Sequence, residues 1–145
     1  MNKAIHLAVA SVLLLAGQLA SSQPGEYQGA PVSTTVFVSF ANGSTSFRPA
    51  PASAETLLNA RDAAMVTIRG RTSTNMPTGR DEALALARAA AARTYLIQQG
   101  VSPLKIMVNY ASAADFIADN TTAAGRQQNQ RVEIDIIHVQ TGQRG

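Results

Sequence analysis

The sequence predicts an α+β fold, a two-layer α/β sandwich with the element order β-α-β-α-β-β, in which helices cover one face of a sheet. Three observations lead to this prediction. Four short segments are rich in β-branched residues or alternate apolar with polar residues, which is typical of strands. Two longer segments have helical composition and lie between these strands. Interleaved strands and helices in a chain of 145 residues indicate one domain with two packed layers.

The first half of the domain is predicted to form strand, helix and strand. Residues 34–40 are β-branched and aromatic, and the turn dipeptide Asn42-Gly43 follows them. Two prolines exclude helix before Ser53, which is predicted to cap a helix that runs to about residue 63. The segment "MVTIRG", residues 65–70, is predicted as the second strand.

The second half is predicted to form helix, strand, short connection and strand. Alanines and leucines predict a long helix over residues 80–99, which Gly100 ends. The segment "KIMVNYA" is the third strand, and the polar run "NTTAAGRQQNQ" has room for one helical turn. Residues 131–139, "RVEIDIIHV", alternate inward apolar residues with outward acids, which predicts a half-buried fourth strand.

The ends of the chain predict export and short flexible flanks. Residues 1–22 have Lys3 near the start, an apolar middle and small residues at the end, the layout of a cleaved secretory signal peptide. The apolar run is shorter than the roughly 20 residues that a membrane-spanning helix needs, which disfavours a retained anchor. Residues 23–33 are predicted as a flexible leader, residues 34–139 as the folded domain and residues 140–145 as a flexible tail.

Composition excludes several classes of protein. The chain has no cysteine, so it forms no disulfide, and Gln18 stands where a lipoprotein signal would carry its lipid-bearing cysteine. The net charge is only +3, the arginines are scattered, and there is no Trp among the few aromatic residues. Nucleic-acid binding needs clustered basic residues with stacking aromatics, so we do not expect it.

The residues also give little support for catalysis. His138 is the only histidine after the predicted signal peptide, and no G-x-S-x-G motif accompanies it. Asp115 and Asp119 are four residues apart but lack a third metal ligand. A phosphate-binding glycine loop is absent as well. We therefore predict a protein that is not an enzyme and that uses no metal and no cofactor.

Arg88 is the most informative residue, because it lies on the inner half of an alanine-rich helix. A guanidinium is rarely buried unless an anion meets it. The preceding loop, residues 71–79, is rich in hydroxyl and amide groups and is expected to arch over one end of the sheet. Arg88 and this loop could form a socket for a small anionic group. An internal salt bridge with Glu133 or Asp135 explains the burial of Arg88 equally well.

Four stretches of the chain carry a resemblance to a known family. They are "FANGSTSFRP", "IRGRTS", "DEALALARAAAARTYLIQQGV" and "NTTAAGRQQNQRVEI". The second is similar to the motif I-x-G-H-T-D, the third to N-x-x-L-S-x-x-R-A followed by Y-L-x-x-x-G-V, and the fourth to N-x-T-x-x-G-R-x-x-N-R-R-V-E-I. On these motifs residues 34–136 resemble the periplasmic OmpA-like domain of outer membrane protein A, peptidoglycan-associated lipoproteins and flagellar stators.

The resemblance implies a ligand site for the diaminopimelate of the peptidoglycan stem peptide, with some substitutions. In the family an aspartate of G-H-T-D and the helix arginine hold this ligand. The arginine is Arg88 here, but Ser73 stands at the aspartate position, and Arg71, Asp81 and Gln130 replace a histidine, an asparagine and an arginine. Ser73 cannot balance an ammonium charge, and losing a charge-assisted hydrogen bond costs about 1.5–3 kcal/mol.

The predicted ligand-binding residues are therefore Arg88, Ser73, Thr72, Asn129 and Arg131. Asp81 is a candidate compensating carboxylate, although seven residues separate it from Arg88, about 10 Å along a helix axis.

Two functions follow from the resemblance. The first is a non-catalytic domain of the Gram-negative periplasm or the inner face of the outer membrane, which binds peptidoglycan weakly or with altered specificity. The second is a structural or adaptor component of a multi-protein envelope assembly, such as a secretion or conjugation apparatus, whose partner is another envelope protein. Neither function requires insertion in a membrane after signal cleavage.

Overall fold

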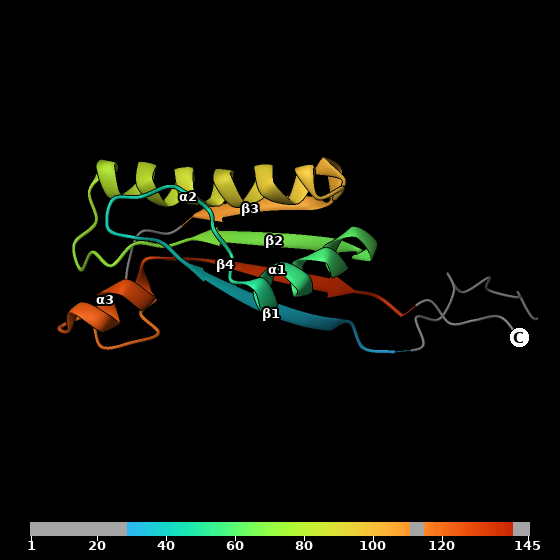
Figure 1. Cartoon of the computed structure of the whole chain (residues 1–145), viewed down its shortest axis with the longest axis horizontal. Helices are drawn as coiled ribbons and strands as arrows, with labels where there is room; N and C mark the ends of the chain where they lie inside the picture. The colour runs from blue at the N-terminus through green and yellow to red at the C-terminus, as the bar shows by residue number, and fades with distance from the viewer. Residues whose placement is uncertain (1–28, 111–114, 141–145) are drawn as a thin grey trace, which may run out of the picture.

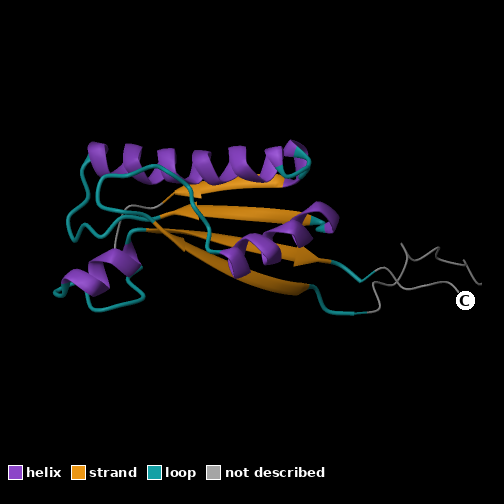
Figure 2. Ribbon diagram, in the orientation of Figure 1, coloured by secondary structure: helices purple, strands orange, loops and turns teal. Residues whose placement is uncertain are grey.

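The computed structural model describes residues 29–110 and 115–140 and shows a two-layer α+β fold (Figure 1). The predicted signal peptide therefore lies outside the described residues, as do parts of the predicted leader and tail. A four-stranded sheet has the order β1-β4-β2-β3, and helices α1 and α2 cover one of its faces (Figure 2). The elements are β1 (Val32–Ser39), α1 (Pro51–Leu58), β2 (Met65–Gly70), α2 (Gly79–Gln98), β3 (Ile106–Tyr110), α3 (Ala123–Asn129) and β4 (Arg131–His138).

The directions of the strands bring four connections to the same end of the sheet. β4 runs antiparallel to β1 and β2, whereas β2 and β3 are parallel. The carboxyl ends of β1, β2 and β3 therefore meet the beginning of β4. The register of β1 with β4 is continuous from Val32 opposite His138 to Ser39 opposite Arg131. At the opposite end of the sheet, Gly29 lies beside Gln140.

The core lies between the sheet and the two covering helices. Alternate apolar residues of β1, β2 and β4 enter it, as the period of two in β4 predicts. Alanines of α2 bring that helix close to β2, and Gly70 makes this approach possible: a Cβ at residue 70 would lie 1.9 Å from the carbonyl oxygen of Ala85. The buried apolar residues include Val36, Val38, Phe40, Leu57, Val66, Ile68, Ala89, Ala92, Leu96, Val132, Ile134 and Ile136.

The element order confirms the predicted fold, but several boundaries differ. β1 begins at Val32, two residues inside the predicted leader. α1 begins at Pro51 with Ala50 as its N-cap, so the assignment of Ser53 as the cap was wrong. The reason is that proline is well tolerated in the first turn, where its missing N–H has no partner in any case. The polar run before β4 forms the seven-residue helix α3 rather than a single turn.

Candidate functional site

The first turn of α2 fixes the entrance of a polar pocket. Thr78 and Asp81 form a capping box, in which Asp81 accepts hydrogen bonds from the backbone N–H and the hydroxyl of Thr78 at 2.9 and 2.8 Å. The hydroxyl of Thr74 donates a third hydrogen bond to this carboxylate at 2.8 Å. These hydrogen bonds from Thr78 and Thr74 hold the pKa of Asp81 below its usual range, so the group is an anion at neutral pH.

Arg88 lies two turns further along the same side of α2 and is 1% exposed. Its guanidinium donates to three backbone carbonyls: Nε to Ser44 at 3.0 Å, Nη1 to Arg71 at 3.0 Å and Nη2 to Ala41 at 3.4 Å. It also lies over the ring of Phe40, with Cζ 5.2 Å from the ring centroid. Burial lowers the pKa of Arg88, yet a guanidinium stays protonated in proteins.

The ionic surroundings decide between the two explanations offered for the burial of Arg88. Among the described residues, no carboxylate forms an ion pair with Arg88. Glu133 and Asp135, the predicted partners, pair with other arginines. The alternative of an internal salt bridge was therefore wrong, and the positive charge of Arg88 is not neutralised by the described part of the chain.

Asp81 and Arg88 line the same pocket, which has a volume of about 100 Å³. Seven residues make about two helical turns, so the two side chains share one side of α2 although they are separated along its axis. The structure brings four of the candidate residues, Arg88, Ser73, Thr72 and Asp81, together around this pocket. The full lining is Asn42, Gly43, Thr72, Ser73, Thr74, Asp81, Leu84, Arg88 and Gln130.

Ser73 is held from two sides. Its hydroxyl accepts a hydrogen bond from Nε2 of Gln130 at 3.1 Å, and its backbone carbonyl accepts one from Nδ2 of Asn120 at 2.8 Å. Gln130 was not among the predicted site residues. A lone glutamine in a polar run carries no signal of burial, whereas an arginine among alanines does.

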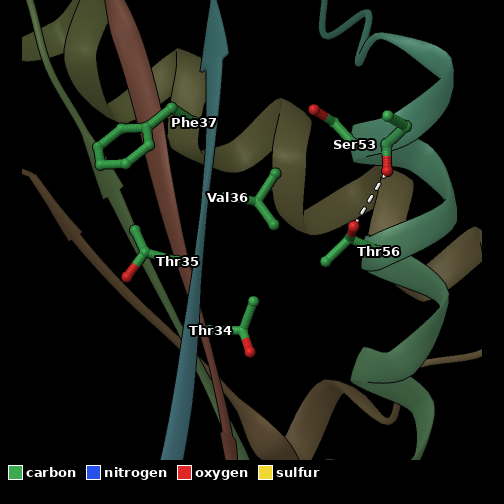
Figure 3. A pocket seen from close by; sticks show the side chains of 7 residues that line it. Thr34, Thr35, Val36, Phe37, Ser53 and Thr56 are labelled. Carbon is green, nitrogen blue, oxygen red and sulfur yellow. Dashed lines mark hydrogen bonds between the residues drawn. The ribbon is translucent and has the colours of Figure 1, made fainter.

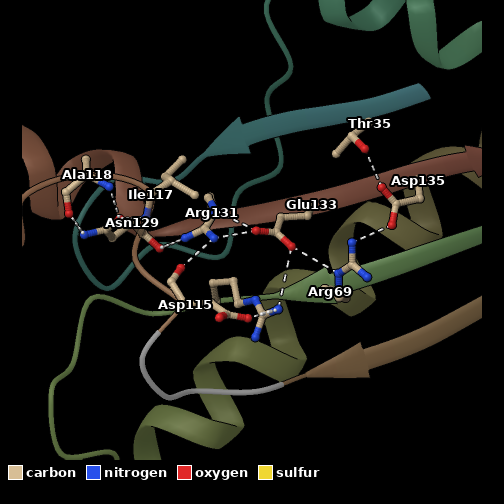
Figure 4. A network of polar contacts seen from close by, with 10 residues as sticks. Thr35, Arg69, Asp115, Ile117, Ala118, Asn129, Arg131, Glu133 and Asp135 are labelled. Atoms are coloured by element: carbon tan, nitrogen blue, oxygen red, sulfur yellow. Dashed lines mark hydrogen bonds and ion pairs between the residues drawn. The ribbon is translucent and has the colours of Figure 1, made fainter. Parts of the chain in front are cut away.

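Asn129 and Arg131 do not line this pocket, in contrast to their predicted role. The amide of Asn129 accepts from the backbone N–H groups of Ile117 and Ala118 and donates to the carbonyl of Ala118 (Figure 4). Nη2 of Arg131 donates to the carbonyl of Asp115 at 2.7 Å and also pairs with Glu133. Both side chains therefore fix the segment before α3, because their hydrogen-bonding groups point into the protein.

Glu133 is the centre of this neighbouring ionic network (Figure 4). It pairs with Arg131, with Arg69 at 3.1 Å and with Arg71 at 3.7 Å. Burial raises the pKa of Glu133, but the hydrogen bonds and charges of Arg131, Arg69 and Arg71 outweigh this and leave it lowered. The predicted outward orientation of Glu133 is correct, but arginine side chains cover it and leave it 8% exposed.

A larger pocket of about 360 Å³ lies between β1 and α1 (Figure 3). Its lining consists only of aliphatic, aromatic and hydroxyl side chains: Thr34, Thr35, Val36, Phe37, Ala52, Ser53 and Thr56. Without a charged group it offers little to orient a small ligand. The smaller pocket at Arg88 is therefore the better candidate for a ligand site.

Comparison with known proteins agrees with the architecture. The model of the OmpA family matches residues 39–130. The chain belongs to the OmpA family. A candidate outer membrane lipoprotein of a type IV secretion system from Brucella suis is 34% identical over 119 residues, which cover 81% of this chain and 69% of the relative.

Two solved structures illustrate the shared fold. The peptidoglycan-associated lipoprotein of Burkholderia pseudomallei is similar with a TM-score of 0.59 and 20% identity, over 70% of this chain and 89% of that one. The cell wall anchor of the type VI secretion system of Pseudomonas aeruginosa gives a TM-score of 0.55 and 25% identity, over 73% and 82% of the two chains.

Membership of the OmpA family confirms the predicted class of protein. It places the chain among non-catalytic domains of the periplasm and cell envelope. Within the described residues, the structure has no helix with the length and hydropathy needed to cross a bilayer. The same residues contain no group of three or more acidic or histidine side chains placed to hold a metal ion.

Proposed function

We propose that this chain binds the stem peptide of peptidoglycan at the pocket formed by α2, the loop after β2 and the turn after β1. The observation that carries the proposal is the unneutralised charge of Arg88 in the pocket wall. Three of the five N–H groups of its guanidinium donate to carbonyls, which leaves one on Nη1 and one on Nη2 for a ligand. A carboxylate is the natural acceptor for both.

Asp81 carries the charge opposite to that of Arg88, so the two residues together suit a zwitterionic ligand. Asp81 and Arg88 line one pocket with charges of opposite sign, and hydrogen bonds keep Asp81 ionised. A ligand with a carboxylate and an ammonium group, such as the diaminopimelate of a stem peptide, complements both. Ser73 adds only a neutral hydroxyl, so we expect the ammonium to be held less tightly than by a carboxylate at that position.

The relatives support a second candidate function. The Brucella suis relative is described as part of a type IV secretion system, which favours an adaptor role in such an assembly. In that role the domain contacts another envelope protein, and cell-wall binding is either absent or an additional activity.

Co-sedimentation with purified diaminopimelate-type sacculi tests the first function. The exported chain is expected to sediment with the sacculi, and Arg88→Ala is expected to abolish this binding because it removes the carboxylate donor. Arg88 also holds three backbone carbonyls, so each variant must first show a native circular dichroism spectrum. Arg88→Lys supplies a milder change, which keeps the charge and loses the bidentate geometry.

The matched control is Arg93→Ala, which removes an arginine from the same helix outside the pocket. This variant is expected to bind as the unmodified chain does. Absence of sedimentation by the unmodified chain would contradict the first function and direct the search to protein partners. Equal binding by folded Arg88→Ala would show that the sacculus is bound elsewhere on the molecule.

A further inference from the structure

The candidate pocket contains a buried hydrogen-bond acceptor that the protein itself does not use. Gln130 connects α3 to β4 and is 8% exposed. Its Nε2 donates to the hydroxyl of Ser73, but Oε1 is buried and has no hydrogen-bond partner among the described residues. Proteins rarely leave a buried acceptor unpaired, because its lost interaction with water is then not replaced.

The residue that carries this unpaired acceptor lines the candidate ligand pocket. Gln130, Ser73, Asp81 and Arg88 all line the same pocket of about 100 Å³. The residues of this lining combine unused donors on Arg88 with an unused acceptor on Gln130. The donors and the acceptor come from different elements, α2 and the α3–β4 junction, so a ligand that uses both must enter between them.

We propose that Gln130 is a specificity-determining residue of this pocket, whose Oε1 accepts a hydrogen bond from an amine of the bound ligand. The ligand class is an amino-acid head group, with a carboxylate on Arg88 and an amine on Gln130. Asp81 favours the protonated form of that amine through its negative charge. This inference rests on the proposed binding of a carboxylate at Arg88.

The hydroxyl of Ser73 has a positioning role in this arrangement. By accepting from Nε2, it fixes the orientation of the Gln130 amide and leaves Oε1 as its unpaired end. A ligand that has the carboxylate but lacks the amine keeps its interaction with Arg88 and gains nothing from Gln130. The pocket therefore distinguishes amino acids from simple carboxylates of the same length.

Titrations followed by NMR chemical shifts test this inference with two probes. The probes are meso-diaminopimelate and pimelate, a dicarboxylate of the same length without the amines. The exported chain purified from the periplasm is compared with Gln130→Leu and Gln130→Glu. The control is Gln128→Leu, which changes an exposed glutamine of α3 that does not line the pocket.

Gln130→Leu is expected to weaken binding of meso-diaminopimelate about tenfold, the usual effect of losing one hydrogen bond to a charged group. Binding of pimelate is expected to be weaker in the unmodified chain and unchanged by the substitution. Gln130→Glu keeps an acceptor and adds a negative charge, so it should bind meso-diaminopimelate at least as tightly as the unmodified chain. Gln128→Leu should match the unmodified chain with both probes.

Three results would overturn the inference. If Gln130→Leu is folded and binds meso-diaminopimelate normally, Gln130 does not contact the amine, although carboxylate binding at Arg88 stands. If Gln130→Glu weakens binding as much as Gln130→Leu, the group that faces Gln130 is not an amine. If the unmodified chain binds neither probe, the proposed function fails together with this inference.

Discussion

The distribution of formal charge among single side chains determines what the pocket can bind. Arg88 and Asp81 are charged, whereas Ser73 and Gln130 are neutral and are already hydrogen-bonded to each other. In the proposed complex, the carboxylate end of the ligand therefore meets a full positive charge in a buried wall. The amine end meets one neutral hydroxyl, one neutral amide oxygen and a carboxylate engaged in a helix cap. We therefore expect the pocket to hold the carboxylate end of the ligand more tightly than the amine end.

Restoring a carboxylate at residue 73 is expected to strengthen binding to sacculi. Ser73→Asp should increase the affinity about tenfold or more, because a charge-assisted hydrogen bond contributes roughly 1.5–3 kcal/mol. Gln130 can still donate to the new carboxylate from its present position. Sedimentation at several sacculus concentrations measures the change. Ser73→Asn is the control without charge, and an equal gain from both variants would show that charge is not the limiting property.

Sequence patterns point to Arg88, Asp81, Ser73 and Thr72 but not to Gln130. Arg88 could be predicted because an arginine on the inner side of an alanine-rich helix requires an explanation. Asp81 could be proposed from its position at the start of that helix. Asn129 and Arg131 do not line this pocket, because their polar groups bind the segment before α3, and the sequence does not show which way a polar group near a site points.

At the scale of the elements, the close contact of β2 with α2 is what carries Arg88 to its position. Gly70→Ala is expected to destabilise the protein by about 3 kcal/mol, near the upper end for overpacking, because the new Cβ would overlap the backbone at Ala85. Urea unfolding measures this change. Gly79→Ala is the control, because a Cβ at that position meets no atom within 4 Å. A stable Gly70→Ala variant would show that α2 can move away from the sheet.

The ionic network on β2 and β4 provides a second test at this scale. Glu133→Gln is expected to cost about 3–5 kcal/mol in unfolding free energy, because it leaves the buried Arg131 without its carboxylate. Asp135→Asn serves as the comparison. Asp135 pairs only with the partly exposed Arg69 among the described residues, so we expect a loss of at most about 1 kcal/mol. Equal losses in the two variants would contradict the central position of Glu133.

The same carboxylate makes stability depend on pH. The pKa of Glu133 is lower in the folded state than its ordinary value near 4.5. Its contribution is therefore fully present above about pH 4.5 and is lost as the pH falls through the lower folded value. Urea unfolding between pH 7 and pH 3 should show this decrease in the unmodified chain and a smaller one in Glu133→Gln. Parallel curves would show that other carboxylates control the acid response.

The elements that the sequence predicts best are those with strong periodicity or composition. β2, β4 and α2 agree with their predicted ranges within one residue at every boundary. α3 was predicted as no more than one turn, because its seven residues are mostly polar and lack an apolar stripe. Its side chain–backbone hydrogen bonds and the cap by Thr122 replace the missing hydrophobic signal.

At the scale of the whole molecule, export is the prediction that the described residues do not address. We expect the periplasmic protein to begin at Gln23, because Ala20 and Ser22 are the small residues that signal cleavage requires. Mass spectrometry of the protein released by osmotic shock measures its amino terminus. A mass equal to that of the full chain, with retention in the membrane fraction, would contradict cleavage.

The pocket and the ends of the described domain lie at opposite ends of the sheet, and this has a mechanical consequence. Gly29 and Gln140 lie beside each other at the end of the sheet where β1 begins and β4 ends, whereas residues that follow the carboxyl ends of β1 and β2 line the pocket. Eight residues of strand span about 26 Å. If the pocket is fixed to the cell wall while the domain is pulled only from the amino-terminal side of β1, the load runs parallel to β1. The strand is then sheared against β4, so all of its ladder hydrogen bonds resist together instead of breaking one after another.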